Sequence, residues 1–158
     1  MRKIKTVVAC VTIAGLAGII APSAAQADNA SETSATGLET GLLMAYGAPY
    51  RNYGDEGTFC EWSGNDGNWA DCSGNPPTGG MQNQAESIYN DGVPSGPTAV
   101  NIYYDRWQSG AYRCLPLGQG WEDLTTGGQT FDHWGNNGHG LNQLVNNNAA
   151  SHKWVYSC

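Results

Sequence analysis

The sequence is poor in positive charge. It holds seven Lys and Arg residues against 14 Asp and Glu residues. Beyond Ala27 lie all 14 acidic residues but only four basic ones, so this part has a formal charge of 4 − 14 = −10. The four are Arg51, Arg106, Arg113 and Lys153. Because proteins bind phosphate backbones through Lys and Arg, we expect no nucleic-acid partner.

The sequence also lacks the motifs of common hydrolases and zinc sites. It has no HExxH, no GxSxG and no pair of CxxC motifs. Asp132 and His133 are adjacent, so in an extended segment their side chains point to opposite faces. We therefore expect a non-enzymatic protein without catalytic residues, and we place His133, His139 and His152 in solvent-exposed loops.

No apolar run is long enough to cross a membrane. The amino-terminal run, residues 6–21, is shorter than the ~20 residues that a spanning helix needs. It follows Arg2, Lys3 and Lys5 and precedes Ala24-Ala25-Gln26-Ala27, which is the order of a secretory signal peptide. Reading Cys10 as a lipoprotein site would leave almost no apolar core before it. We expect residues 1–27 to be a cleaved signal peptide, and the protein to be secreted, extracellular and free of the membrane after cleavage.

Four cysteines remain once Cys10 leaves with the signal peptide. They are Cys60, Cys72, Cys114 and Cys158. An even number in a small exported domain indicates disulfides, although four cysteines allow three pairings. We favour Cys60–Cys72 and Cys114–Cys158, which give each half of the domain one disulfide.

The composition changes near residue 58. Residues 28–57 are rich in Ser, Thr, Ala, Gly and acids, which is typical of a flexible linker or propeptide, with a short helix around Thr40–Tyr46. Residues 58–158 carry short apolar and aromatic bursts between Gly, Asn, Asp and Pro clusters, a pattern typical of antiparallel strands. No long stretch has the apolar spacing of an amphipathic helix. We expect one all-β domain over 58–158.

A repeat divides this domain into two similar units. Phe59-x-x-Trp62-x4-Gly67-x-Trp69 parallels Asn101-x-x-Tyr104-x5-Gly110-x-Tyr112. Further on, Asn83-Gln84-Ala85-Glu86-Ser87 parallels Asn147-Asn148-Ala149-Ala150-Ser151. We expect two four-stranded units, at about 58–93 and 99–158, packed face to face.

The second unit resembles a known family. Tyr103-Tyr104-Asp105-x4-Gly110-Ala111, Gly118-x-Gly120-Trp121-Glu122-Asp123-Leu124 and the run 145–155 are similar to a βγ-crystallin Greek key. In particular they resemble secreted bacterial peptidase inhibitors of the metalloproteinase-inhibitor type. The resemblance implies a βγ-crystallin-like sandwich of two Greek-key motifs, and a monomer that inserts a loop into the active site of an extracellular protease. No residue matches the family's protease-contacting site, so the contact residues are unknown.

A rigid loop loses less entropy on binding than a mobile one. By this reasoning two segments are candidate contact loops. Asp71–Gly80 lies beside Cys72, and Gly127–Gly140 is rich in Gly and Asn.

The two polar turns are candidate calcium sites. Calcium-binding βγ-crystallin domains use the pattern [N/D][N/D]xx[S/T]S, and calcium prefers several charged oxygen ligands. Here Ile88 and His152 replace the last Ser, and most of the carboxylates are absent. We expect weak calcium binding at most and no other cofactor, and one alternative function is therefore a weakly calcium-binding structural βγ-crystallin domain. The interpretation without calcium is that these side chains only bond their own turns. The candidate ligands are Asn83, Glu86, Ser87, Asn147, Asn148 and Ser151.

Aromatic residues suggest a different function, a carbohydrate- or cell-surface-binding module. Exposed aromatics stack on sugars or anchor interfaces. Trp69, Trp107 and Trp134 lie near Gly- and Asn-rich turns and are the surface candidates. We expect a second group in the core, namely Trp62, Tyr104, Trp121 and Trp154.

Overall fold

The structure, a computed structural model, describes residues 41–47 and 57–158. Within these ranges all regular secondary structure is β, and no helix that could span a bilayer occurs in them. The strands are β1 (Leu42–Gly47), β2 (Phe59–Trp62), β3 (Ser73–Asn75), β4 (Ala85–Asp91), β5 (Ala99–Tyr103), β6 (Tyr112–Leu115), β7 (Gly120–Trp121) and β8 (Ser151–Val155). The predicted signal peptide, residues 1–27, lies outside the described residues.

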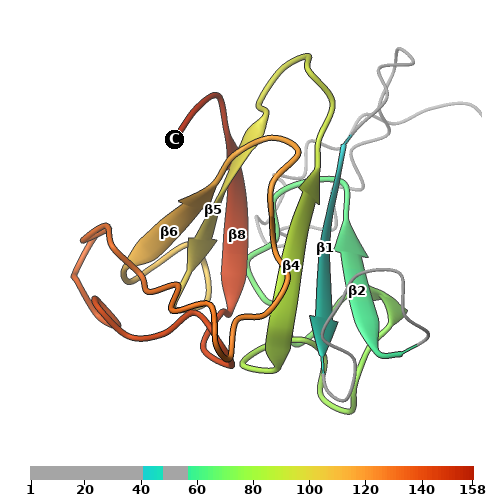
Figure 1. The fold of residues 1–158 in the computed structure, drawn as a ribbon, viewed down its shortest axis with the longest axis horizontal. Helices are drawn as coiled ribbons and strands as arrows, with labels where there is room; N and C mark the ends of the chain where they lie inside the picture. Colours follow the sequence, from blue (N-terminus) through green and yellow to red (C-terminus); the bar gives the residue numbers. More distant parts are fainter. Residues whose placement is uncertain (1–40, 48–56) are drawn as a thin grey trace, which may run out of the picture. The chain divides into compact units, whose positions relative to one another are not determined.

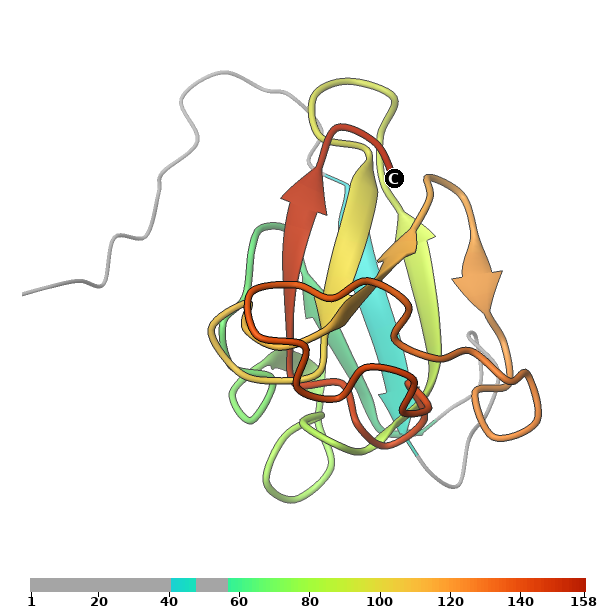
Figure 2. The ribbon, with the colours of Figure 1, turned by 90° about the vertical axis from the view of Figure 1, so that its left-hand side faces the viewer.

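The strands form two antiparallel sheets that face each other (Figures 1 and 2). The larger sheet has the order β3-β2-β1-β4-β7, and the smaller sheet has the order β6-β5-β8. Read from the other side, the first four strands lie in the order 4-1-2-3, which defines a Greek key. The expected all-β sandwich with Greek-key topology is confirmed.

Each half of the chain contributes one segment to the sheet of the other half. β7 comes from the second half but pairs with β4, with Ile88 opposite Trp121. In return, Asp66 of the first half pairs with His152 of β8, through N···O distances of 2.8 and 3.3 Å. A second reciprocal pair closes the two polar turns, since Asn83 N donates to Ala149 O at 2.9 Å and Asn147 N donates to Ala85 O at 3.1 Å.

The core lies between the two sheets. Alternate residues of β1 point inward, so that Leu43 and Ala45 are fully buried, and β5 contributes Val100 and Ile102 from the opposite side. Burying one such branched side chain stabilises the fold by about 2 kcal/mol. Phe131 fills the core from the long connection between β7 and β8.

The two disulfides have the expected partners. Cys60 of β2 is bonded to Cys72, 12 residues away, and Cys114 of β6 is bonded to Cys158, 44 residues away. The first lies next to β3, and the second attaches the chain end to the smaller sheet. Such bonds form in oxidising compartments.

The prediction of a linker over residues 28–57 is wrong for its described part. Leu42–Gly47 forms neither linker nor helix but β1, which lies between β2 and β4 in the larger sheet. The folded domain therefore begins at or before Leu42 rather than at 58, and its first Greek key includes β1. The segment was misassigned because Leu, Met and Ala favour helices when judged by propensity alone, whereas here two neighbouring strands supply the backbone hydrogen bonds.

Candidate functional site

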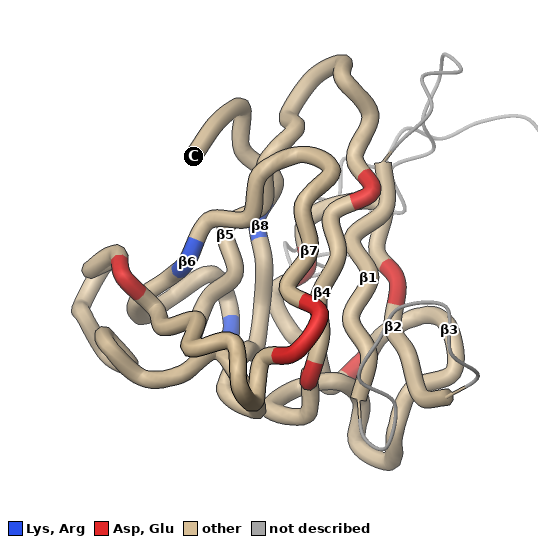
Figure 3. Tube along the Cα trace, viewed as in Figure 1, with Lys and Arg blue, Asp and Glu red and all other residues tan. Residues whose placement is uncertain are grey.

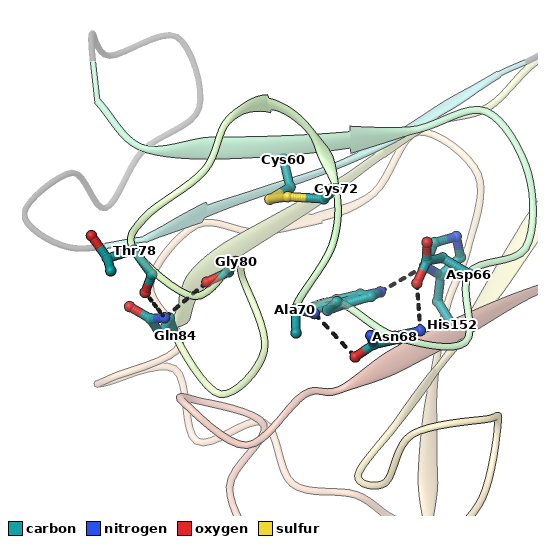
Figure 4. Close-up of a disulfide and its surroundings, with 10 residues drawn as sticks. Cys60, Asp66, Asn68, Ala70, Cys72, Thr78, Gly80, Gln84 and His152 are labelled. Carbon is teal, nitrogen blue, oxygen red and sulfur yellow. Dashed lines mark hydrogen bonds between the residues drawn. A yellow bond between two sulfur atoms is a disulfide. The ribbon is translucent and has the colours of Figure 1, made fainter.

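The segment Asp71–Gly80, one of the two candidate contact loops, is held at its start by a disulfide. Its strand β3 pairs with β2 at one edge of the larger sheet, and all three of its residues are exposed. Cys72, immediately before β3, is bonded to Cys60 on β2 (Figure 4). Pro76 and Pro77 follow the strand and fix two φ angles.

The same loop is held at its end by one side chain. The Gln84 amide Nε2 donates to Thr78 O at 3.2 Å and to Gly80 O at 2.8 Å (Figure 4). Gly80 has φ +78°, and a Cβ there would lie 2.3 Å from Ala70 O, so only glycine fits this close approach. We call Asp71–Gly80 the clamped loop, because it is exposed in the middle and fixed at both ends.

The other candidate loop, Gly127–Gly140, is partly built into the domain. Phe131 is fully buried, and Arg113 Nη1 donates to Thr130 O at 3.0 Å and to Asp132 Oδ2 at 3.1 Å. The ring of His133 stacks on Tyr112 with centroids 4.6 Å apart. This loop is therefore anchored in the core by a buried residue in its interior, whereas no residue from 71 to 79 of the clamped loop is buried.

The candidate calcium turns adopt matching backbone conformations. Asn83 and Asn147, their first residues, have φ 56° and 55°. Asn148 Nδ2 donates to Leu144 O at 3.0 Å and to Asn146 O at 3.1 Å, much as Gln84 at the equivalent position donates to the clamped loop. The second-position amides of both turns thus bond nearby backbone.

The serines of the two turns differ. Ser151 Oγ donates to Asp105 O at 2.6 Å, whereas Ser87 Oγ is buried without a hydrogen-bond partner in the described part of the chain. Glu86 already takes part in an interaction. Residues 41–47 and 57–158 contain no group of three His, Cys, Asp or Glu that could hold a metal ion. Calcium binding by these turns stays a prediction.

Two side chains predicted at the surface are buried. Trp69 and His152 are both 0% exposed, so the surface prediction for Trp69 and the loop prediction for His152 are wrong. The Trp69 backbone N–H donates to Ala150 O at 3.0 Å, which draws its Gly- and Asn-rich segment against β8. There the indole stacks on Trp62, with ring centroids 4.7 Å apart.

The other tryptophans lie close to their expected places. Trp107 and Trp134 are 73% and 63% exposed. Trp62 is buried, while Tyr104, Trp121 and Trp154 are half-buried and pack against the core. A role of Trp107 and Trp134 in binding stays a prediction.

His133 and His139 are exposed, as expected, and each is paired with a carboxylate. His133 Nδ1 lies 2.6 Å from Asp132 Oδ1, so the prediction that these two side chains point to opposite faces is wrong. His139 Nδ1 lies 2.8 Å from Asp105 Oδ2. Burial lowers the pKa of His152 to about 4.

Two carboxylates also have shifted pKa values. Partial burial raises the pKa of Asp66, although the N–H of Asn68 opposes the rise. The hydroxyls of Thr125 and Thr126 hold the pKa of Asp123 far below its usual range. The described ranges carry nine acidic residues against three basic ones, so this part of the chain is acidic, and Figure 3 marks both kinds along the backbone.

Sequence reasoning missed the side chains that hold the loops in place. Gln84 was seen as part of a polar turn, but its contact with the clamped loop depends on folding, because it bonds residues four and six positions away in a non-helical segment. Asp105 was seen only as part of a family pattern, yet it joins His139 across 34 residues of sequence. No local sequence motif predicts either contact.

No protein-family model matches the sequence, and no curated protein matches it. Two solved structures are similar in fold. One is a βγ-crystallin from an archaeon, with TM-score 0.47 and 12% identity over 73% of this chain and 99% of that chain. The other, from work on the evolution of the eye-lens βγ-crystallin domain fold, has TM-score 0.42 and 16% identity over 75% and 88%. The strand order itself defines the fold class, an all-β sandwich with Greek-key topology and two disulfides.

Proposed function

We propose that the chain is exported and inhibits a peptidase by presenting the clamped loop to the peptidase active site. The observation that carries this function is the exposed edge strand β3, which is fixed at Cys72 on one side and by Gln84 on the other. Extended segments bind partners by main-chain pairing at a strand edge. A loop that is already ordered loses little entropy on binding.

The arrangement also explains how an inhibitor would survive the peptidase. A bound loop is cut slowly when its ends cannot separate after cleavage. Cys72 fixes one end to β2, while Gln84 holds the other through Thr78 O and Gly80 O, and Met81 N donates to Trp69 O at 2.7 Å immediately after it. A cut between them would leave both new ends near their starting positions and favour religation.

The first test is an inhibition panel. The exported form is mixed at micromolar concentration with a thermolysin-like metallopeptidase, a subtilisin-like serine peptidase and a papain-like cysteine peptidase. We expect inhibition of at least one class, and mass spectrometry of the slowly formed product should find a cut within 71–80. If all three peptidases keep full activity, or if the cut lies elsewhere, the proposed function is wrong.

The second test loosens the loop without changing its sequence. Gln84→Ala removes two hydrogen bonds to the loop carbonyls, and we expect inhibition to weaken about tenfold, which corresponds to about 1.4 kcal/mol. Gln143→Ala, at an exposed glutamine outside the clamped loop, is the matched control and should inhibit like the parent. Equal inhibition by both variants would show that the clamp plays no part.

A further inference from the structure

A hollow of about 630 Å³ opens beside the two polar turns. Its walls come from the β5–β6 connection, from the residues before β4 and from the second turn. The residues that matter here are Gln82, Asn83, Tyr104, Asp105, Trp107 and Asn148. A hollow of this size accommodates a ligand of two or three rings.

Trp107 is held at the rim of the hollow in a costly backbone conformation. It has φ 61° and the next residue, Gln108, has φ 53°, a left-handed region that bulky residues rarely adopt. Two hydrogen bonds maintain the turn: Trp107 N donates to Gly67 O at 2.7 Å, and Gln108 N donates to Ser151 Oγ at 3.0 Å. The fold thus keeps a strained turn that leaves a large apolar side chain 73% exposed to water.

The indole is supported from one side by a glycine. A Cβ on Gly67 would lie 2.5 Å from Trp107 Cε3, so the ring occupies the space that any other residue at 67 would fill. The ring is therefore placed against backbone while most of its surface stays exposed. A supported, exposed indole plane is what stacking on the apolar face of a sugar requires.

Polar groups around the ring are already ordered. Arg106 Nε donates to Gln82 Oε1 at 2.7 Å, and Asp105 Oδ2 lies 2.8 Å from His139 Nδ1. Asn83 and Asn148 bring amide groups from the two turns. Amides can donate to and accept from the hydroxyl groups that a sugar carries on its edge, and a carboxylate can accept from them.

We propose that this hollow binds a neutral oligosaccharide of two or three units, with one sugar ring stacked on Trp107. This function is separate from peptidase inhibition. Nine acidic residues against three basic ones in the described ranges disfavour anionic sugars and nucleotides. A purely apolar ligand fits less well, because the lining of the hollow includes several amides, a carboxylate and the guanidinium of Arg106 besides Trp107.

The experiment follows the indole N–H resonances of the exported form by NMR. Chitotriose, cellotriose, maltotriose and mannotriose are the neutral probes, and trigalacturonate is the acidic one. We expect at least one neutral probe, at millimolar concentration, to shift the Trp107 indole resonance and the side-chain amides of Asn83 and Asn148. Trp107→Ala should weaken binding of that probe at least about tenfold.

Two further variants separate the ring from the rest of the surface. Gly67→Ala keeps Trp107 but displaces its ring, so it should also weaken binding of the probe. Trp134→Ala removes an exposed tryptophan that does not line the hollow, and it should bind like the parent. Both Trp107→Ala and Trp134→Ala should keep any peptidase inhibition.

Three results would overturn the sugar site. They are no response of the Trp107 resonance to any neutral probe, a response to the acidic probe alone, and equal weakening by Trp107→Ala and Trp134→Ala. A peptidase panel without inhibition would leave the sugar result untouched, so the two functions fail separately.

Discussion

The indole Nε1 of Trp69 donates a 2.8 Å hydrogen bond to Nδ1 of His152, and both side chains are fully buried. On its other side His152 Nε2 lies 2.7 Å from the carbonyl oxygen of Gly64, which can only accept. The imidazole is therefore neutral, with its proton on Nε2. A second proton on Nδ1 would break the bond to Trp69 and place a charge in the core.

This pair predicts that acid destabilises the fold. The folded pKa of His152 is about 4, below the ordinary value of 6.5, so between these pH values the unfolded chain binds more protons than the folded one. The contribution of neutral His152 to the free energy of unfolding is fully present above pH 6.5. It is lost as pH falls toward 4, by on the order of 3 kcal/mol. The free energy of unfolding, measured with urea along this pH range, checks the prediction.

The control is the variant pair His152→Asn and His133→Asn. His152→Asn should flatten the pH dependence of the free energy of unfolding. His133→Asn, at an exposed histidine, should keep that dependence. If His152→Asn does not fold, the His152 resonance of the parent decides: it should not titrate above pH 5 while the fold persists. Titration near pH 6.5 in the folded protein would contradict the prediction.

The two disulfides should differ in what they support. Cys114→Ser/Cys158→Ser opens a bridge of 44 residues and should cost about 4 kcal/mol of unfolding free energy, against about 3 for Cys60→Ser/Cys72→Ser, which opens 12. Only Cys60→Ser/Cys72→Ser frees the clamped loop. We therefore expect this variant to weaken inhibition, and Cys114→Ser/Cys158→Ser to leave it unchanged, when both are measured at a temperature where they are folded.

Two neighbouring glycines in the clamped loop give a matched test of its geometry. Gly79 and Gly80 both have positive φ, but a Cβ at 79 meets nothing within 4 Å, whereas one at 80 meets Ala70 O at 2.3 Å. Gly79→Ala should cost about 1 kcal/mol from the backbone alone. Gly80→Ala should cost at least about 2 kcal/mol more, because backbone must move. Equal unfolding free energies for the two variants would contradict this packing.

Calcium should stabilise the protein little. The amides of Gln84 and Asn148 and the hydroxyl of Ser151 already bond their own surroundings, and the described part of the chain gathers no metal-binding carboxylate cluster. A site with Kd near 1 mM would add only about 0.4 kcal/mol at 1 mM calcium. The melting temperature with calcium and with chelator measures this. A rise of more than about 10 °C would show a strong site instead.

Much of the fold could be predicted from sequence because its signals are local. Turn residues between short apolar bursts indicated antiparallel strands, and the parallel between Asn83–Ser87 and Asn147–Ser151 located two equivalent turns. The other repeat was misaligned. It aligned β2 with β5. In the structure β5 corresponds to β1 instead, because each of these two strands lies between two neighbouring strands of its sheet.

The errors share a physical cause, since each depended on a partner far away in sequence. Leu42–Gly47 is a strand because β2 and β4 flank it. Trp69 is buried because its segment pairs with β8. Its hydrogen-bond partner on that strand, His152, is 83 residues away in the sequence. The clamp on Asp71–Gly80 and the hollow beside Trp107 likewise arise only after folding, so composition could suggest their chemistry but not their placement.

The exchange of segments between the two halves also determines how the molecule can be made. Neither half encloses its own interior, since β7 completes one sheet and the segment around Asp66 borders the other. The final strand, β8, carries His152, with which the buried side chain of Trp69 makes its hydrogen bond. The interior can therefore seal only when nearly all of the described domain is free to fold, and until then the partly folded chain exposes apolar surface and unpaired strand edges.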